Sequence, residues 1–147
     1  MVPSYNGALA TWRGQRSMTR RVLQPGSLKD PRPRYSQGIQ IDGARSLVFI
    51  AGQTASDEQG AVVGKGDIEQ QTERVFQNLG AVLTAAGATF DNLMMTTTYL
   101  TDIRHREAYN KVRLKYWASA PPTSTLIVVK ALGHEDFLIE IDGIAVL

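Results

Sequence analysis

Glu140 is the residue whose type and surroundings point most directly to chemistry. It lies in the apolar run Leu138-Ile-Glu-Ile141 near the C-terminus. A carboxylate with apolar neighbours is costly to bury without a partner or a task, so Glu140 could hold and orient a water molecule. An exposed sheet face or a salt bridge between subunits would explain the same carboxylate. The residues alone leave both interpretations open.

Tyr35 is the second candidate, because it follows Pro33-Arg34 and precedes Ser36-Gln37-Gly38 at the expected start of a strand. A phenol in that place could face a cleft. It could equally be an edge aromatic packed on its own domain, and the sequence does not decide between the two.

Several common catalytic and cofactor-binding patterns are missing. The chain has no cysteine, which excludes disulfides, thiolate metal sites and a cysteine nucleophile. His105 and His134 have no ligand partner at metal-binding spacing, so we interpret both as surface residues. Residues 64–67, Gly-Lys-Gly-Asp, lack the spacing of a phosphate loop, and no Gly-x-Ser-x-Gly elbow occurs. We expect neither a metal nor a cofactor.

The composition predicts one globular domain, with 147 residues, 43% of them hydrophobic and 20% charged. No apolar run approaches the roughly 20 residues that a membrane-spanning helix needs, and no signal-peptide core is present. With no cysteine to suggest an oxidising compartment, the cytoplasm is the default expectation.

The positive charge is concentrated in an N-terminal leader without acids, which holds Arg13, Arg16, Arg20 and Arg21. The formal net charge is +2, so the remaining domain is close to neutral. We interpret Arg104 and Arg106 as a solvated helix end and do not expect nucleic-acid binding. Residues 1–22 are predicted to form a flexible arm, with Met18 a candidate true start and a transit peptide the alternative, and residues 23–147 a single domain.

The hydrophobic spacing places the elements. Gln24–Pro33 carries three prolines and is expected to be extended, and Tyr35–Ile41 and Ser46–Ala51 are predicted to form a hairpin around Asp42-Gly43. From Asp67 a three- and four-residue period predicts a long helix capped by Gly87. A strand over Leu93–Thr101 follows.

Asp102 is expected to cap a second helix that ends near Ala118. Two further strands, Thr123–Leu132 and Phe137–Val146, complete a β-β-α-β-α-β-β order. Alternation along the last strand places Glu140 and Asp142 on the same face. This order predicts an α+β fold with both helices on one face of a mixed sheet and the other face covered by self-association.

These segments together resemble the RidA/YjgF family of reactive-intermediate deaminases, over about Leu23 to Val146. The motifs that carry the resemblance are Tyr35–Gly38, Val48–Gln53, Asn78-Leu79, Thr96–Asp102, Tyr109-Asn110 and Leu138–Ala145. The resemblance implies a chorismate-mutase-like subunit in a barrel-forming homotrimer with clefts between subunits. It also implies hydrolysis of 2-imino or 2-enamino acids to the keto acid and ammonia, without a cofactor.

The resemblance assigns roles to particular residues. Glu140 falls at the glutamate that positions water, Tyr35 at the site tyrosine and Asn110 at the helix asparagine, and Ser36 beside Tyr35 is a further candidate for substrate binding. The arginine that grips the substrate carboxylate is replaced by Thr123, which removes a contact of about 1.5–3 kcal/mol. Arg34 and Arg45 are conceivable substitutes, whereas Lys130 lies too far along the strand and on its other face.

Two functions therefore remain. The first is a hydrolytic deaminase for an imine, enamine or related C–N bond, with a non-standard substrate, in which Thr123 and Thr125 supply donors near the reacting carbon and Glu140 activates water. The second is a non-catalytic trimer that binds a small metabolite or acts as a regulatory or chaperone-like protein.

Overall fold

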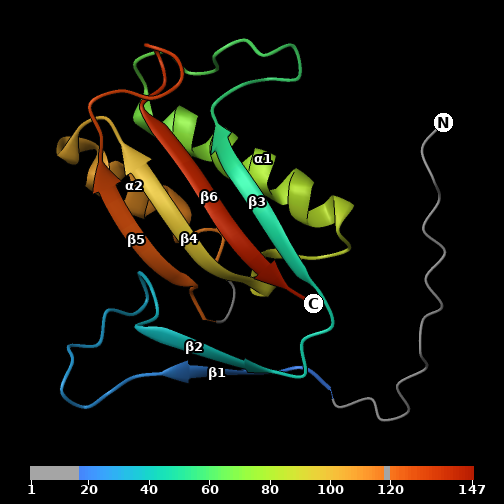
Figure 1. Cartoon of the computed structure of the whole chain (residues 1–147). Helices are drawn as coiled ribbons and strands as arrows, with labels where there is room; N and C mark the ends of the chain where they lie inside the picture. The colour runs from blue at the N-terminus through green and yellow to red at the C-terminus, as the bar shows by residue number, and fades with distance from the viewer. Residues whose placement is uncertain (1–16, 118–119) are drawn as a thin grey trace, which may run out of the picture.

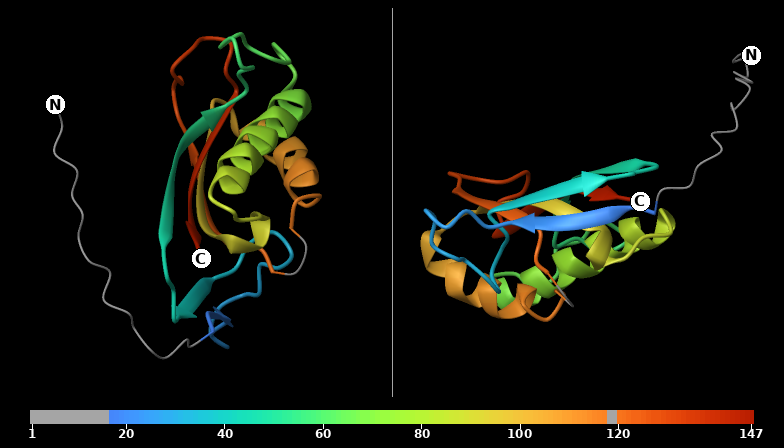
Figure 2. Two further views of the ribbon diagram at one scale, coloured as in Figure 1. Left: turned by 90° about the vertical axis from the view of Figure 1, so that its right-hand side faces the viewer. Right: turned by 90° about the horizontal axis from the view of Figure 1, so that it is seen from below.

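The computed structural model describes residues 17–117 and 120–147, which form two layers (Figure 1). The main sheet has the strand order β3-β6-β4-β5, and the α-helices of the described chain, α1 and α2, cover one of its faces while the other face stays open (Figure 2). The strands are β3 (Leu47–Thr54), β4 (Leu93–Leu100), β5 (Thr123–Val128) and β6 (Ile139–Val146). The predicted α+β architecture is confirmed.

The sheet is mixed because β6 runs antiparallel to both of its neighbours while β4 and β5 are parallel. Along β6, Ile139 and Ile141 are buried beneath the helices. Glu140 and Asp142 alternate with them and lie on the open face, where Glu140 is paired in register with Tyr99 of β4. The predicted alternation is confirmed, and it exposes two carboxylates on the face without helices.

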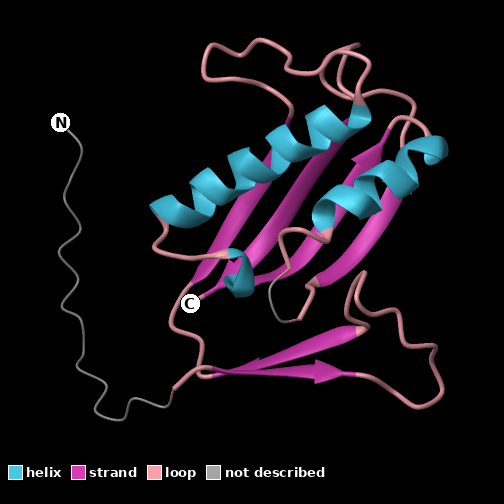
Figure 3. Cartoon of the chain, turned by 180° about the vertical axis from the view of Figure 1, so that it is seen from behind, coloured by secondary structure: helices cyan, strands magenta, loops and turns pink. Residues whose placement is uncertain are grey.

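Helix α1 (Ile68–Ala85) matches its prediction closely. It begins after Asp67, whose side chain accepts a hydrogen bond of 3.0 Å from the backbone N–H of Gln70. It ends at Ala85, shortly before Gly87, which adopts the left-handed backbone (φ 69°) that favours glycine. Figure 3 shows this helix lying across the sheet. Its buried apolar side chains are Val75, Phe76, Leu79 and Leu83.

The N-terminal strands differ from the prediction. Strand β1 (Thr19–Leu23) was not predicted, since its two arginines mask the alternation, and it pairs with β2 (Gly38–Asp42) at one end of the main sheet (Figure 1). The predicted hairpin is wrong, because β3 pairs with β6 instead of β2. Arg20 anchors the extra ribbon by donating hydrogen bonds of 3.1 Å to the carbonyls of Ala120 and Pro121. Of the predicted arm, residues 1–16 lie outside the described residues.

Helix α2 (Arg106–Arg113) is shorter than predicted, because the chain turns at residues 114–116. Its buried Tyr109 contacts β4, with 2.8 Å between the Tyr109 hydroxyl and Thr98 Oγ1. β5 and β6 are also shorter than expected, so that residues 129–138 form the connection between them. In the part of the chain that is described, no helix is long and apolar enough to cross a membrane.

Gln71 ties α1 to two loops, and its loss should destabilise the fold. Its fully buried amide donates to the carbonyls of Gly64 (3.2 Å) and Asp136 (2.7 Å) and accepts from the N–H of Leu138 (2.8 Å). Gln71→Leu leaves these buried backbone groups without hydrogen-bond partners, so we expect the free energy of unfolding to fall by about 2–4 kcal/mol. Urea denaturation at matched protein concentration measures the loss. Gln77→Leu, on the exposed side of the same helix, is the control, and equal effects of the two changes would contradict this role.

Candidate functional site

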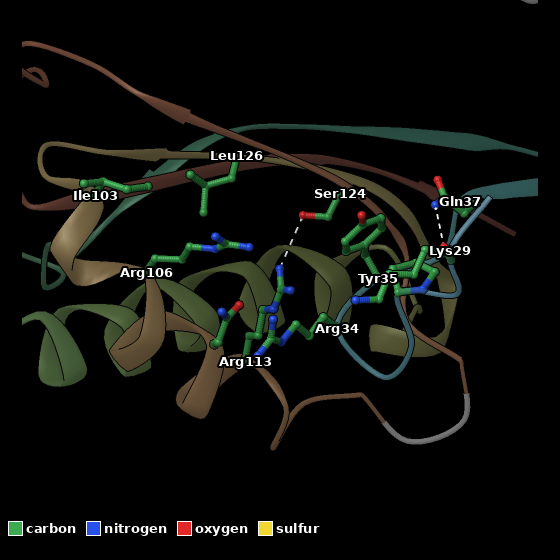
Figure 4. Close-up of a pocket in the computed structure, with 11 residues that line it drawn as sticks. Lys29, Arg34, Tyr35, Gln37, Ile103, Arg106, Arg113, Ser124 and Leu126 are labelled. Atoms are coloured by element: carbon green, nitrogen blue, oxygen red, sulfur yellow. Dashed lines mark hydrogen bonds between the residues drawn. The ribbon is translucent and has the colours of Figure 1, made fainter.

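A hollow of about 490 Å³ lies between β5, α2 and the loop that precedes β2 (Figure 4). Tyr35 and Asn110, both predicted as site residues, line it. Asn110 is 5% exposed and donates to Glu107 Oε1 at 3.4 Å. Ser124 and Leu126 of β5 form the wall opposite α2. The hollow thus lies on the helix-covered side of the sheet.

Ser36 lies outside this hollow despite its position next to Tyr35. Its hydroxyl is buried and donates to the carbonyl of Pro121 at 2.6 Å, and its N–H donates to the carbonyl of Pro122 at 2.9 Å. These bonds connect the segment just before β2 to the prolines just before β5. Within one chain Ser36 therefore positions Tyr35 and does not face the ligand space.

Thr123 and Thr125 lie on the open face of the sheet, because they alternate with Ser124 and Leu126, which face the hollow. The hydroxyl of Thr123 donates to the carbonyl of Met94 at 3.0 Å. The alternation separates both threonines from Tyr35 and Asn110. It places them on the same side of the sheet as Glu140.

Glu140 lies in a shallow depression of the open face together with Tyr99, Asp142 and Gly133. Within the described part of the chain its carboxylate makes no hydrogen bond or ion pair. Asp142, by contrast, accepts from the Tyr99 hydroxyl at 3.1 Å, and this bond raises the pKa of Tyr99 above its ordinary value. Of these two neighbouring carboxylates, Glu140 is the one available to a water molecule or a ligand.

The Glu140 side chain lies directly over Gly52 of β3. A Cβ at Gly52 would be 1.8 Å from Glu140 Oε1, and the other close atoms also belong to the Glu140 side chain. The strand pairing is irregular here, between Ile50 and Gln53. A glycine at this point therefore provides the space in which the carboxylate rests.

The most prominent feature of the hollow is its positive charge. Lys29, Arg34, Arg106 and Arg113 line it, and no described carboxylate is part of its lining. At the rim, Glu107 compensates part of this charge, because its carboxylate lies 3.8 Å from the Arg34 guanidinium. Arg34, suggested as a substitute for the missing arginine, lines this hollow and therefore lies on the opposite side of the sheet from Thr123.

Sequence reasoning missed three of these cations. It treats Arg106 as part of a solvated helix end and assigns no role to Lys29 or Arg113. The spacing of Arg106, Asn110 and Arg113 was the available signal, because residues four and then three positions apart lie on the same helix face. The other suggested substitute, Arg45, lies elsewhere, beside the C-terminal Leu147.

Comparison with known proteins identifies the family. The sequence model of the family described as Endoribonuclease L-PSP matches residues 27–147, and the chain belongs to this family. A RutC family protein of Synechocystis is 37% identical over 133 residues, covering 88% of this chain and 98% of the relative. Human 2-iminobutanoate/2-iminopropanoate deaminase is 28% identical over 130 residues, covering 88% and 92% of the two chains. The resemblance to RidA/YjgF proteins is confirmed.

Solved structures agree with this assignment. A Rid family protein of unknown function from Yersinia pestis, YyfB, superposes with a TM-score of 0.80 and 31% identity, covering 87% of this chain and 98% of that one. A Mycobacterium tuberculosis member of the YjgF/YER057c/UK114 family gives a TM-score of 0.61 at 27% identity, covering 88% of this chain and all of the other. Fold and family are thereby established independently of the site.

The contact between Gly52 and Glu140 predicts a specific energetic coupling. Gly52→Ala should cost about 1 kcal/mol of unfolding free energy, because the Glu140 side chain must leave its rotamer. The same change in a Glu140→Ala background should cost almost nothing, since the colliding atoms are gone. A double-mutant cycle by urea denaturation measures this coupling. An equal cost in both backgrounds would show that the added methyl collides with backbone instead.

Proposed function

We propose that this protein is a homotrimer that hydrolyses a reactive imine or enamine in clefts between its subunits, with Glu140 as the residue that activates water. Family membership supports the reaction class, because a relative that matches most of this chain is named as a deaminase of 2-imino acids. The absence of cysteine favours a reducing compartment such as the cytoplasm.

The division of the candidate residues between two sides of the sheet is the observation that carries the proposal. Glu140, Thr123 and Thr125 lie on the open face, whereas Tyr35 and Asn110 line the hollow on the helix side. A small substrate cannot touch both groups within one chain. A second copy that packs against the open face near β5 could place its own Tyr35 and Asn110 opposite Glu140.

The open face has the character of a surface for self-association. Phe49 on β3 is 75% exposed, although the next residue, Ile50, is buried under α1. Leu47, Met95 and Ile127 are also exposed apolar side chains of the main sheet. Exposed apolar patches of this kind usually mark an interaction surface. Covering them with further subunits would supply the second half of each cleft.

The chemistry needs water and a proton acceptor but no cofactor. Glu140 takes a proton from a water molecule whose oxygen attacks the carbon of the C=N bond, and passes this proton to the imine nitrogen as the double bond becomes a single bond. The resulting carbinolamine then loses ammonia as its hydroxyl oxygen forms the new carbonyl. Thr123 and Thr125 provide hydroxyl groups on the same face, while Tyr35 and Asn110 of the neighbouring subunit hold the substrate.

A binding protein without turnover is the second candidate, and one observation favours it. Thr123 stands where the resemblance places a carboxylate-gripping arginine, so the usual contact to a 2-imino acid is missing from β5. The clefts would then hold a small metabolite and serve regulation.

Ammonia release from 2-iminopropanoate and 2-iminobutanoate, generated in situ by an amino acid oxidase, tests the reaction. We expect the wild type to accelerate hydrolysis and Glu140→Gln to lose at least about a hundredfold in rate, because the general base is gone. Glu135→Gln, in the exposed turn before β6, is the control for a lost surface carboxylate. Full activity in Glu140→Gln would remove Glu140 from the mechanism, and an inert wild type that gains activity as Thr123→Arg would favour the binding protein.

Mixing two inactive variants tests whether the cleft is shared. Glu140→Gln and Tyr35→Ala are each expected to be inactive, but trimers reassembled from an equal mixture contain some clefts in which both residues are native. Random assembly should recover about a quarter of the wild-type activity if each cleft takes one residue from each of two subunits. No recovery, with trimers confirmed by analytical ultracentrifugation, would place the whole site within one chain.

A further inference from the structure

We propose that Arg113, Arg106 and Arg34 form an anion clamp on the helix side of β5, and that it selects a small ligand carrying two or more negative charges. The inference deepens the proposed function and rests on it in one respect, that the ligand is an imine or enamine substrate. In chemical terms the substrate class is a 2-imino acid with a second acidic group.

Arg113 provides the first step, because its guanidinium is buried without a counterion. The side chain is 4% exposed, and within the described residues no carboxylate lies within salt-bridge distance of it. Its Nη1 donates to the Tyr109 hydroxyl at 2.9 Å and reaches Ser124 Oγ at 3.5 Å, and its Nε is buried without a partner among the residues that the structure describes. A buried charge that is not neutralised is costly, so a compensating ligand is expected.

The surroundings of Arg113 lower the free-energy cost of burying its positive charge, but they do not neutralise the charge. The guanidinium carbon lies 4.8 Å from the centre of the Tyr109 ring, within the range of a cation–π contact. Because that contact and the hydroxyl bond both come from Tyr109, they direct the guanidinium towards Ser124 and the hollow. Arg113 is thus oriented before any ligand arrives.

The other cations converge on the same space. Figure 4 shows Arg106 and Arg34 extending into the hollow from α2 and from the loop before β2, with Lys29 near Tyr35. One carboxylate, Glu107 at the rim, offsets part of this charge through its 3.8 Å contact with Arg34. A ligand with a single carboxylate would leave most of the positive charge of the hollow uncompensated. Two or more negative charges on the ligand match the hollow better, and planar guanidinium groups suit carboxylates in particular.

The remaining lining fits a short carbon chain between two acidic groups. Ile103 and Leu126 contribute apolar surface, while Asn110 and Tyr35 offer polar atoms. The hollow therefore combines positively charged groups with a partly apolar wall. A small dicarboxylate, with two acidic groups joined by a short carbon chain, matches this lining. A phosphate ester shares the charge, and the experiment must separate the two.

Isothermal titration calorimetry with non-reacting ligands tests the clamp directly. The probes are the keto dicarboxylate 2-oxoglutarate, the keto monocarboxylate 2-oxobutanoate and a phosphomonoester, glycerol 3-phosphate. We expect 2-oxoglutarate to bind at least about tenfold more tightly than 2-oxobutanoate, because it makes an additional charge-assisted contact. Equal affinity for these two acids would overturn the proposal. If glycerol 3-phosphate binds most tightly, the clamp stands but the acidic group it selects is a phosphate.

Variants assign the binding to the named residues. Arg106→Gln and Arg34→Gln are exposed changes that should leave the fold intact and weaken 2-oxoglutarate about tenfold or more each. Arg113→Met should weaken it further, and if that variant does not fold, the two exposed changes still decide the matter. Arg104→Gln is the matched control, because Arg104 is bonded to Asp102 and is not part of the hollow. Equal losses in Arg104→Gln and Arg106→Gln would overturn the clamp.

The same proteins separate this inference from the proposed function. Tight, clamp-dependent binding of 2-oxoglutarate without hydrolysis of any imine would retain the clamp and reject the deaminase. Hydrolysis of 2-iminobutanoate that is unaffected by Arg106→Gln would retain the deaminase and reject the clamp. A short single-stranded RNA that binds more tightly than every small anion would reject the choice of a small-molecule ligand.

Discussion

The buried hydroxyl of Tyr109 is the interaction on which the site depends. It meets Thr98 of β4 at 2.8 Å and accepts from Arg113 at 2.9 Å. A hydroxyl excluded from water has to find such partners, so this pair of bonds sets how α2 lies across the sheet. The orientation of α2 in turn decides that Arg106 and Asn110 face the hollow. One phenol therefore links the fold to the charge pattern of the candidate site.

The second constraint is that helices cover only one face of the sheet. Strand alternation then sends every other residue of β5 and β6 to a face that the described chain does not cover. Glu140 and exposed apolar residues such as Phe49 occupy it together. Burying that apolar surface between subunits would be favourable, and it would also bring the carboxylate into an enclosed environment. The alternation of side chains along β5 and β6 thus places the candidate catalytic carboxylate on the same face as the apolar surface available for assembly.

The sequence predicted those features that depend on periodicity and local caps. Helix α1 was predicted from its spacing, its Asp67 cap and Gly87, and the two faces of β6 followed from simple alternation. Periodicity shows which face a residue occupies but not which strand lies beside it, and for that reason the hairpin prediction failed. Strand β1 escaped notice because Arg20 and Arg21 make it look like a polar leader.

The site was only half predictable for a related reason. Motif matching finds residues at positions that other proteins use, and it drew attention to Thr123, where the resemblance places an arginine. It cannot find charges at positions outside the motifs, and Arg106 and Arg113 occupy helix positions where arginine is ordinarily solvated. Burial of Arg113 became visible only when the packing of Tyr109 was known.

A clamp on α2 would change what a ligand must look like. An arginine on β5 next to the reacting carbon suits a carboxylate attached directly to that carbon. The guanidinium groups of the clamp would instead bind an acid on the helix side of β5, the side opposite Glu140. The ligand would then have to extend from the hollow of one subunit to Glu140 of its neighbour. A molecule with an acidic group at one end and a reactive C=N bond nearer the other meets that requirement, and the two ends would be recognised by different subunits. Specificity would then arise from the distance between charge and reaction centre, a quantity that the assembly itself determines.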